Sequence, residues 1–256
     1  MHIQDIHITP IAITDPPLLN AAGLHAPYAL RTIIEVVTND GISGLGEVPG
    51  RAETTAALQA AAEVLVGQDP FQRNAIYRGL VERFGAGNQP NNLTGWRRRQ
   101  IVHVFSAIEV ACFDIMGKAT GRPVCDLLGG RARDRVDFSA YLFYKYAEHI
   151  ERPYAPDPWG EALTPAQLVA QARRMIDLYG FQSIKLKAGA LPPEQEAAGI
   201  LALAQAFPGK PLRIDHNANW TVATSLRIVE QLRGVLEYYE DPAPGLDGMA
   251  DRKSVV

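Results

Sequence analysis

Two lysines, Lys185 and Lys187, stand two residues apart in the short apolar stretch 181–189, FQSIKLKAG. Side chains of a β-strand alternate between its faces, so this spacing places both ammonium groups on the same face. Each positive charge disfavours protonation of the other, and we therefore expect a lysine pKa that is lowered toward neutrality. A lysine tuned in this way can take a proton from a substrate. Taken alone, however, the pair is better explained as the solvated basic face of an amphipathic strand.

Acidic and amide side chains end the next two apolar runs. Asp215 and Asn217 lie in RIDHNANW, and Glu240 lies in EYYEDP. The carboxyl ends of parallel barrel strands meet at one rim, which holds the active site, so we expect these groups near the lysines. Two carboxylates in oxygen-rich surroundings suit a hard cation such as Mg²⁺. Each carboxylate taken singly also fits a solvated loop acid or a helix cap. Strand alternation turns His216 away from the site, and we assign it no role.

The elements that would position these residues alternate between strand and helix. Four strands, at 136–144, 181–188, 212–217 and 235–240, are separated by three helices, at 164–179, 192–207 and 222–233. Thr164 is a suitable N-cap, followed by Pro165 at the first helical position. This rhythm with short connections predicts a parallel sheet or barrel. No glycine-rich phosphate loop follows any of these strands, which argues against a nucleotide-binding doubly wound sheet.

The N-terminal half has a different order, with strands first and helices after. We expect strands at 3–13, 30–38 and 42–47, loops at 18–29 and 85–95, and helices at 53–66 and 101–118. Asn39-Asp40-Gly41 is a strong hairpin turn signal between the second and third of these strands. Segregated strands and helices predict an α+β domain up to about residue 130.

The composition of the 256 residues is that of a globular protein, with 47% hydrophobic and 21% charged residues. A net charge of −3 indicates neither a nucleic-acid nor a membrane partner, and we interpret Arg97–Arg99 as a solvated run. Cys112 and Cys125 show no metal-ligand spacing, which fits a reducing cytoplasm. We see no signal peptide, and we expect no apolar run to approach the roughly 20 residues that span a bilayer.

Several motifs together resemble the enolase superfamily, in its mandelate racemase/muconate-lactonizing branch. They are the lysine strand, RIDHNANW, EYYEDP and the stretch 105–130, which looks like the capping-domain signature of that branch. Residues 8–47 and the YLFY of 141–144 are closest to glucarate dehydratase and its relatives. The resemblance implies an α+β capping domain over 1–132, followed by the first half of a (β/α) TIM-type barrel over 133–256.

The resemblance also implies roles for single residues. Asp215 and Glu240 match the first two ligands of a Mg²⁺ ion, Lys187 matches the general base, and Lys185 matches its electrostatic partner, which also contacts the substrate carboxylate. Four further residues match contacts to an acid-sugar substrate: Asn20, His25, Tyr141 and Asn217. Without the resemblance, His25 would be an ordinary loop histidine and Tyr141 a packing residue.

The implied reaction is β-elimination of water from a hexarate such as glucarate, which gives a 2-keto-3-deoxy sugar acid. Racemisation of a 2-hydroxy acid is a second possibility, and a non-catalytic truncated paralogue that pairs with a full-length subunit is a third.

A complete barrel takes about 250 residues, whereas residues 136–256 number 121. We therefore expect a chain truncated after its fourth barrel strand, in which the third metal ligand and the His–Asp acid/base pair of the family have no place. Little dehydratase activity is then expected from the chain alone, and a homo-oligomer is expected only for a complete barrel.

Overall fold

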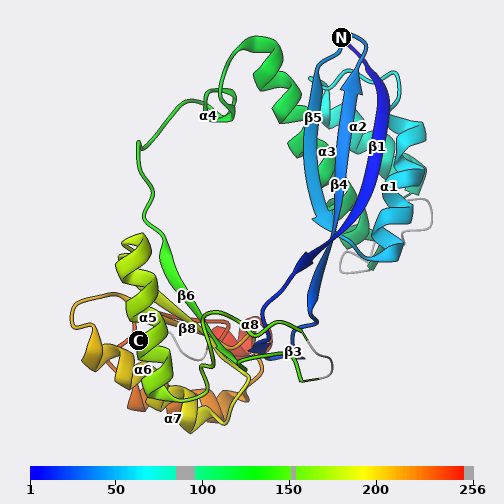
Figure 1. Ribbon diagram of the computed structural model, residues 1–256. Coiled ribbons are helices and arrows are strands. Elements are labelled where there is room, and N and C mark those ends of the chain that lie inside the picture. The colour runs from blue at the N-terminus through cyan, green and yellow to red at the C-terminus, as the bar shows by residue number, and fades with distance from the viewer. Residues whose placement is uncertain (85–95, 151–153, 251–256) are drawn as a thin grey trace. The chain divides into compact units, whose positions relative to one another are not determined.

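The computed structural model describes residues 1–84, 96–150 and 154–250, and the chain divides into two compact units (Figure 1). Unit 1 consists of Met1–Ile13 and Tyr28–Asp134, and unit 2 consists of Thr14–Pro27 and Arg135–Val256. The loop predicted at 85–95 and the side chains of Arg97–Arg99 lie outside the residues that are described.

A three-stranded sheet forms one layer of unit 1. Its order is β1 (Ile3–Thr14), β4 (Tyr28–Thr38) and β5 (Ser43–Pro49), with β4 and β5 antiparallel (Figure 1). Every second residue of β4 from Thr32 onward is buried, because alternate side chains face the core. The predicted turn joins β4 to β5, and Gly41 supplies the left-handed φ of 77° there.

Helices form the second layer of unit 1. They are α1 (Ala52–Leu65), α2 (Arg73–Phe84) and α3 (Trp96–Thr120), followed by the short α4 (Val124–Leu127). Two glycines allow α3 to lie directly on β5. A Cβ atom at Gly44 would stand 2.1 Å from the carbonyl oxygen of Ala111, and one at Gly46 would stand 1.9 Å from that of Ala107. Any larger residue at either glycine would therefore push the helix off the sheet.

The apolar character of α3 exceeds what the sequence led us to expect. Its stretch Gln100–Thr120 is long enough to cross a bilayer and contains an 18-residue window with a mean hydropathy of 1.4, so the expectation that no run approaches this length is wrong. In unit 1, however, this stretch supplies Ile108, Cys112 and Ile115 to the core. Burial in the core of unit 1 accounts for part of this hydropathy, since 39% of the apolar window is buried.

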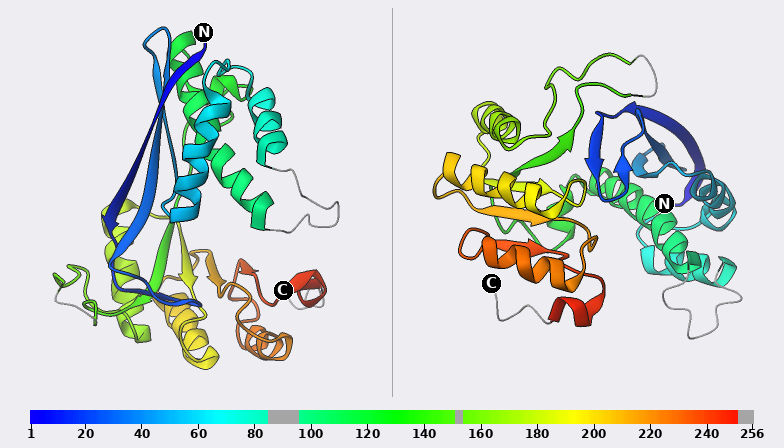
Figure 2. Two further views of the ribbon diagram at one scale, coloured as in Figure 1. Left: turned by 90° about the vertical axis from the view of Figure 1, so that its right-hand side faces the viewer. Right: turned by 90° about the horizontal axis from the view of Figure 1, so that it is seen from below.

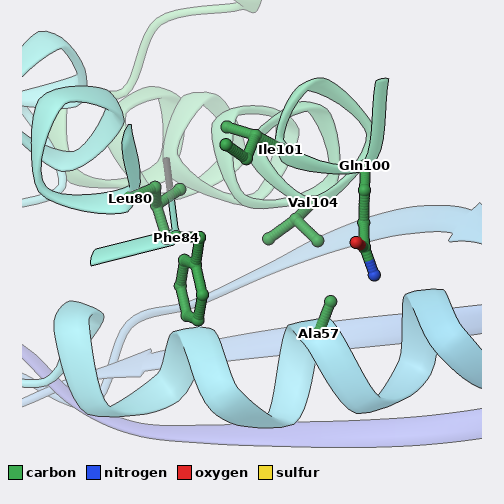
Figure 3. Close-up of a pocket in the computed structure, with 6 residues that line it drawn as sticks. All are labelled: Ala57, Leu80, Phe84, Gln100, Ile101 and Val104. Carbon is green, nitrogen blue, oxygen red and sulfur yellow. The ribbon is translucent and has the colours of Figure 1, made fainter. Parts of the chain in front are cut away.

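A small hollow of about 40 Å³ lies among α1, α2 and α3. Figure 3 shows the six residues that line it: Ala57, Leu80, Phe84, Gln100, Ile101 and Val104. None of these side chains ionises, and only Gln100 is polar. The hollow therefore offers no group for acid–base or metal chemistry.

Unit 2 contains the strand–helix alternation that the sequence predicted. The strands are β6 (Ser139–Lys145), β7 (Ser183–Lys187), β8 (Leu212–Asp215) and β9 (Tyr238–Glu240), and the helices are α5 (Pro165–Tyr179), α6 (Pro193–Ala206), α7 (Val222–Gln231) and α8 (Gly245–Ala250). The four strands are parallel and adjacent in chain order. This is the arrangement of successive repeats in a TIM-type barrel, and the sheet remains open among the residues described.

The two faces of this sheet differ in chemistry. One face packs against the helices, as the two views in Figure 2 show, and buries Leu142, Leu186 and Ile214. Strand alternation places Lys185 and Lys187 on the other face. Helix α5 begins with the predicted Thr164 cap, completed by the Gln167 side chain as a capping box.

A short hairpin from the N-terminal part of the chain extends this sheet. Strands β2 (Leu18–Asn20) and β3 (Gly23–Leu24) pair with each other, and Leu18 and Leu19 of β2 pair antiparallel with β6. The loop predicted over 18–29 is therefore wrong for these residues. The pairing also places Thr14–Pro27 in unit 2, whereas the predicted division at residue 132 assigned it to the first domain. The partner strand is remote in sequence, so no local pattern indicates this pairing.

Candidate active site

The predicted cluster forms at the carboxyl ends of three neighbouring strands. Lys187 on β7 lies in register with Asp215 on β8, and Asp215 lies in register with Glu240 on β9. The Lys187 ammonium donates a hydrogen bond to Asp215 Oδ2 at 2.6 Å. The Lys185 ammonium donates to Glu240 Oε2 at 2.6 Å and lies 3.3 Å from Asp215 Oδ2. Parallel pairing thus brings together two cations and two anions that are up to 55 residues apart in sequence.

Burial makes these contacts strong. The Asp215 side chain is 2% exposed, and that of Lys187 is 11% exposed. Burial raises the pKa of the Asp215 carboxyl, but the bonds from Lys187 and from the backbone N–H of Asn217 together hold that pKa below its usual value.

The expectation of a lowered lysine pKa is wrong for Lys185. Its partial burial lowers the pKa, but the hydrogen bond to Glu240 and the attraction of Asp215 outweigh burial and raise the pKa above its ordinary value. The reason is the identity of the nearest charges, which are carboxylates and not the second lysine.

The donor set suits a divalent cation. Oxygens of Asp215 and Glu240 converge on one point, which the Lys185 ammonium occupies as a positive charge between them. Carboxylate oxygens are the ligands that Mg²⁺ prefers. Among the residues described, no group of three or more His, Cys, Asp or Glu side chains could hold a metal ion.

Asn217 has an unusual backbone beside this site. Its φ of 50° is left-handed, and its backbone N–H donates to Asp215 Oδ1 at 2.9 Å. The turn therefore orients the Asp215 carboxylate through the backbone of Asn217, while the residue itself is exposed. His216 turns the other way, as predicted, and stacks on Trp220 with a ring-centroid separation of 4.0 Å.

Two aromatic rings continue the site along β6. The Lys185 ammonium lies 5.1 Å from the ring centroid of Tyr141. That ring lies 4.8 Å from the ring of Phe143, and the imidazole of His25 contacts Phe143 edge-on at 6.1 Å. The rings therefore link the lysine cluster to the β2–β3 hairpin within unit 2.

Two of the four predicted substrate contacts, Asn20 on β2 and His25 directly after β3, contact each other. Asn20 Nδ2 lies 2.7 Å from His25 Nε2, and His25 Nδ1 lies 2.9 Å from Asp15 Oδ2. Sequence reasoning missed Asp15 and Phe143. The spacing of Phe143 two residues after Tyr141 could have indicated the same strand face, whereas no sequence signal links Asp15 to His25.

A buried acid, also missed from the sequence, fixes the loop that follows the lysines. Glu196 is fully buried on α6, and its carboxylate accepts hydrogen bonds from the backbone N–H groups of Gly189, Ala190 and Leu191, each at 2.9 Å. The end of β7 is thereby anchored to the next helix.

Two family models match the chain. Residues 14–129 match the model of the mandelate racemase/muconate lactonizing enzyme N-terminal domain, and residues 167–255 match that of the enolase C-terminal domain-like family. A protein of Streptomyces coelicolor named probable glucarate dehydratase is 46% identical over 259 residues, which cover 97% of this chain and 60% of the relative. The chain thus spans about 60% of the length of that relative.

Two solved structures of enolases are also similar to this chain. An enolase from Thermobispora bispora, complexed with magnesium and formate, is 55% identical with a TM-score of 0.92, over 100% of this chain and 61% of the other. An enolase from Pseudomonas fluorescens, with bound magnesium, potassium and tartrate, is 49% identical with a TM-score of 0.92, over 99% of this chain and 62% of the other.

Proposed function

The chain belongs to the mandelate racemase/muconate lactonizing enzyme family of the enolase superfamily, and from that membership we propose that it is a Mg²⁺-dependent dehydratase of acid sugars that acts on a hexarate such as glucarate. The observation that carries the proposal is the convergence of Lys185, Lys187, Asp215 and Glu240 at the carboxyl ends of neighbouring parallel strands. The dehydratase name of the Streptomyces relative and the magnesium and small acids in the solved relatives support it.

Each residue of the cluster has one task in this proposal. Asp215 and Glu240 hold Mg²⁺, which when bound stabilises negative charge on the substrate carboxylate. Lys185 neutralises the same carboxylate from the side of the Tyr141 ring. Lys187 removes the proton from the carbon next to that carboxylate. In the structure Lys187 donates to Asp215, so it becomes a base only when that bond is released and its proton is lost.

The remaining predicted residues would bind the rest of the substrate. Asn20 and His25 belong to the segment that pairs with β6, Tyr141 lies on β6 with its ring near Lys185, and Asn217 follows Asp215. Loss of the β-hydroxyl then gives an enol, which becomes the 2-keto-3-deoxy acid. The acid that assists this departure is not assigned to any residue that the structure describes.

Exchange of the α-proton tests the proposal, because it needs only the base and the bound carboxylate. The 256-residue chain is incubated with D-glucarate and Mg²⁺ in D₂O, and the α-proton signal is followed by ¹H NMR. We expect Mg²⁺-dependent loss of that signal, at least about 100-fold slower in Lys187→Met, since general base catalysis contributes about 10²–10⁴-fold. Undiminished exchange in Lys187→Met would contradict the assigned base.

The two alternatives give different outcomes in the same experiment. A racemase of 2-hydroxy acids would exchange the α-proton of a simple 2-hydroxy acid such as mandelate faster than that of glucarate. A non-catalytic chain would bind Mg²⁺ without exchanging either proton. A cytoplasmic location and a homo-oligomeric assembly of the complete barrel belong to the same proposal.

A further inference from the structure

Three aromatic side chains of unit 2, His216, Trp220 and Tyr239, have no task in the proposed function, and we call them the aromatic cluster. His216 directly follows Asp215, and Tyr239 directly precedes Glu240. Strand alternation turns both rings away from the face that carries the two carboxylates. Trp220 belongs to the core on the helix side of the sheet, and Tyr239 packs against that core. The cluster therefore lies behind the two proposed metal ligands.

A hydrogen bond inside the cluster joins the end of β8 to β9. His216 Nε2 lies 3.0 Å from the hydroxyl oxygen of Tyr239. The imidazole also stacks on Trp220, with ring centroids 4.0 Å apart and an interplanar angle of 15°. His216 is fully buried and Trp220 is 6% exposed, so the imidazole end of the bond is shielded from water.

The backbone is left-handed directly after each proposed ligand. Asn217, Ala218 and Asp241 have φ values of 50°, 57° and 42°, and they are the only non-glycine residues with positive φ in the part of the chain that the structure describes. Residues with a Cβ keep this conformation only where the surroundings enforce it. The N–H of Ala218 donates to the carbonyl of Asp241 at 2.9 Å, so the two turns are bonded to each other.

The position of Glu240 depends on such contacts, because its own strand holds it weakly. Strand β9 is three residues long and lies at the edge of the sheet that the structure describes. The Glu240 side chain is 35% exposed, whereas that of Asp215 is 2% exposed. The bond between His216 and Tyr239 and the bond between the turns therefore set the separation of the two carboxylates.

A fixed separation of two ligands discriminates between cations. Mg²⁺ demands near-ideal octahedral geometry at about 2.0–2.1 Å, whereas Ca²⁺ accepts flexible geometry at about 2.3–2.6 Å. Loosening the pair of carboxylates should therefore weaken the binding of Mg²⁺ more than that of Ca²⁺.

We propose that His216, Trp220 and Tyr239 are positioning residues, which hold Asp215 and Glu240 at a separation that favours Mg²⁺ over the larger Ca²⁺. The selection of Mg²⁺ rests on the proposed function. The fixing of the two turns by the aromatic cluster does not.

Backbone order parameters from ¹⁵N NMR relaxation test the fixing of the turns without any metal. Tyr239→Phe keeps the ring and removes the hydroxyl group. We expect values of about 0.85, typical of rigid backbone, for the amides of Ala218 and Asp241 in the unmutated chain, and clearly lower values in Tyr239→Phe. Tyr144→Phe is the matched control, because the buried Tyr144 hydroxyl has no hydrogen-bond partner among the residues described. Unchanged order parameters in Tyr239→Phe, or the same decrease in Tyr144→Phe, would overturn the proposal.

Calorimetric titration with Mg²⁺ and Ca²⁺, without substrate, tests the selection of the ion. In Tyr239→Phe the ratio of the Mg²⁺ affinity to the Ca²⁺ affinity should fall about fivefold, the value of one net hydrogen bond. Loss of folded protein would lower both affinities alike and leave the ratio unchanged. Tyr144→Phe should keep the ratio of the unmutated chain.

A second variant checks that the bond itself is responsible. His216→Phe keeps a ring beside Trp220 but cannot bond to Tyr239, so it should lower the ratio as Tyr239→Phe does. The double variant should lower it no further, because both substitutions remove the same bond. Additive effects in the double variant would overturn the assigned bond.

The outcomes separate the two proposals. An unchanged affinity ratio in Tyr239→Phe, with both ions bound, would overturn the selection of Mg²⁺ by the aromatic cluster. Failure of the unmutated chain to bind Mg²⁺ would overturn the proposed function together with that selection, and the order parameters would still decide whether the cluster fixes the turns.

Discussion

Lys185 occupies the position between the two proposed metal ligands and contacts both of them. A cation bound by Asp215 and Glu240 must compete with this ammonium. The lysine therefore has two opposed effects, because it would help to bind the substrate carboxylate and would weaken the binding of Mg²⁺.

Replacing Lys185 by Met should consequently tighten Mg²⁺ binding. Removal of even about 1 kcal/mol of charge repulsion gives about a fivefold higher affinity, measurable by calorimetry of the chain without substrate. Glu240→Gln should act in the opposite direction because it removes a ligand charge. Lys210→Met is the control, since Lys210 donates to the carbonyl of Phe181 and not to either carboxylate. Weaker Mg²⁺ binding in Lys185→Met would show that the two carboxylates do not hold the ion.

Glu196 predicts a pH dependence of stability. Burial raises the pKa of its carboxyl more than the three backbone N–H groups lower it. Between the ordinary glutamate value of 4.5 and that raised pKa, the folded state binds more protons than the unfolded state. Glu196 therefore contributes fully to the stability of the folded state below pH 4.5. This contribution is lost as the pH rises through the raised pKa that Glu196 has in the folded state.

Urea unfolding at several pH values tests this sign. The unfolding free energy of the unmutated chain minus that of Glu196→Gln should decrease as pH rises from 4.5. Glu194→Gln on the same helix is the matched control, because the bond from Arg227 lowers the pKa of Glu194, so that its contribution is full above pH 4.5 and the corresponding difference stays level there. Parallel pH profiles for the two variants would refute the assignment.

Sequence reasoning placed the lysines on one strand face because alternation is a local property. The sequence did not indicate which charged side chains the two lysines contact. Whether the charge nearest to Lys185 is an ammonium or a carboxylate depends on the register of β7, β8 and β9. That register is set by pairing between strands that are distant in sequence. The error in the Lys185 pKa follows directly from that missing register.

At the scale of elements, the closest packing in unit 1 is that of α3 on β5. Gly46→Ala should destabilise unit 1 by about 3 kcal/mol or more, because its Cβ would stand 1.9 Å from the Ala107 carbonyl, a backbone atom that cannot rotate away. Gly79→Ala on α2 is the control, since its Cβ would meet only the Val64 side chain, at 3.1 Å. Denaturation midpoints by circular dichroism measure both. A loss of stability in Gly46→Ala that is no larger than the loss in Gly79→Ala would contradict this account.

Elements with their own periodicity were predictable, and elements defined by a remote partner were not. Helix α5 was predicted to begin at a Thr164 cap, and the structure confirms this cap. Strands β2 and β3 are only three and two residues long, too short to show alternation. They exist because Leu18 and Leu19 pair with β6, so the hairpin and its Asp15–His25 contact needed the structure.

At the scale of the molecule, the two units have separate hydrophobic cores. The core of unit 1 includes Ile108, that of unit 2 includes Leu186, and no residue belongs to both among those described. Truncation of a buried aliphatic side chain costs about 2–5 kcal/mol in the core that contains it.

Hydrogen exchange monitored by mass spectrometry at increasing urea concentration can follow each core. Ile108→Ala should lower protection in unit 1 first, and Leu186→Ala should lower it in unit 2 first, because each cavity lies in one core. Equal loss of protection in both units from either variant would show one cooperative unfolding transition instead.

The segment of residues 14–27, which contains the β2–β3 hairpin, also has a consequence for biosynthesis. It leaves the ribosome well before β6, the strand with which it pairs, and the whole of residues 28–134 is made in the interval. Unit 1 can therefore collapse while the hairpin is still an unpaired nascent segment, held at one end by β1 and at the other by β4. The side chains of Asn20 and His25 then gain their final neighbours only during late translation, when β6 emerges and closes a long loop.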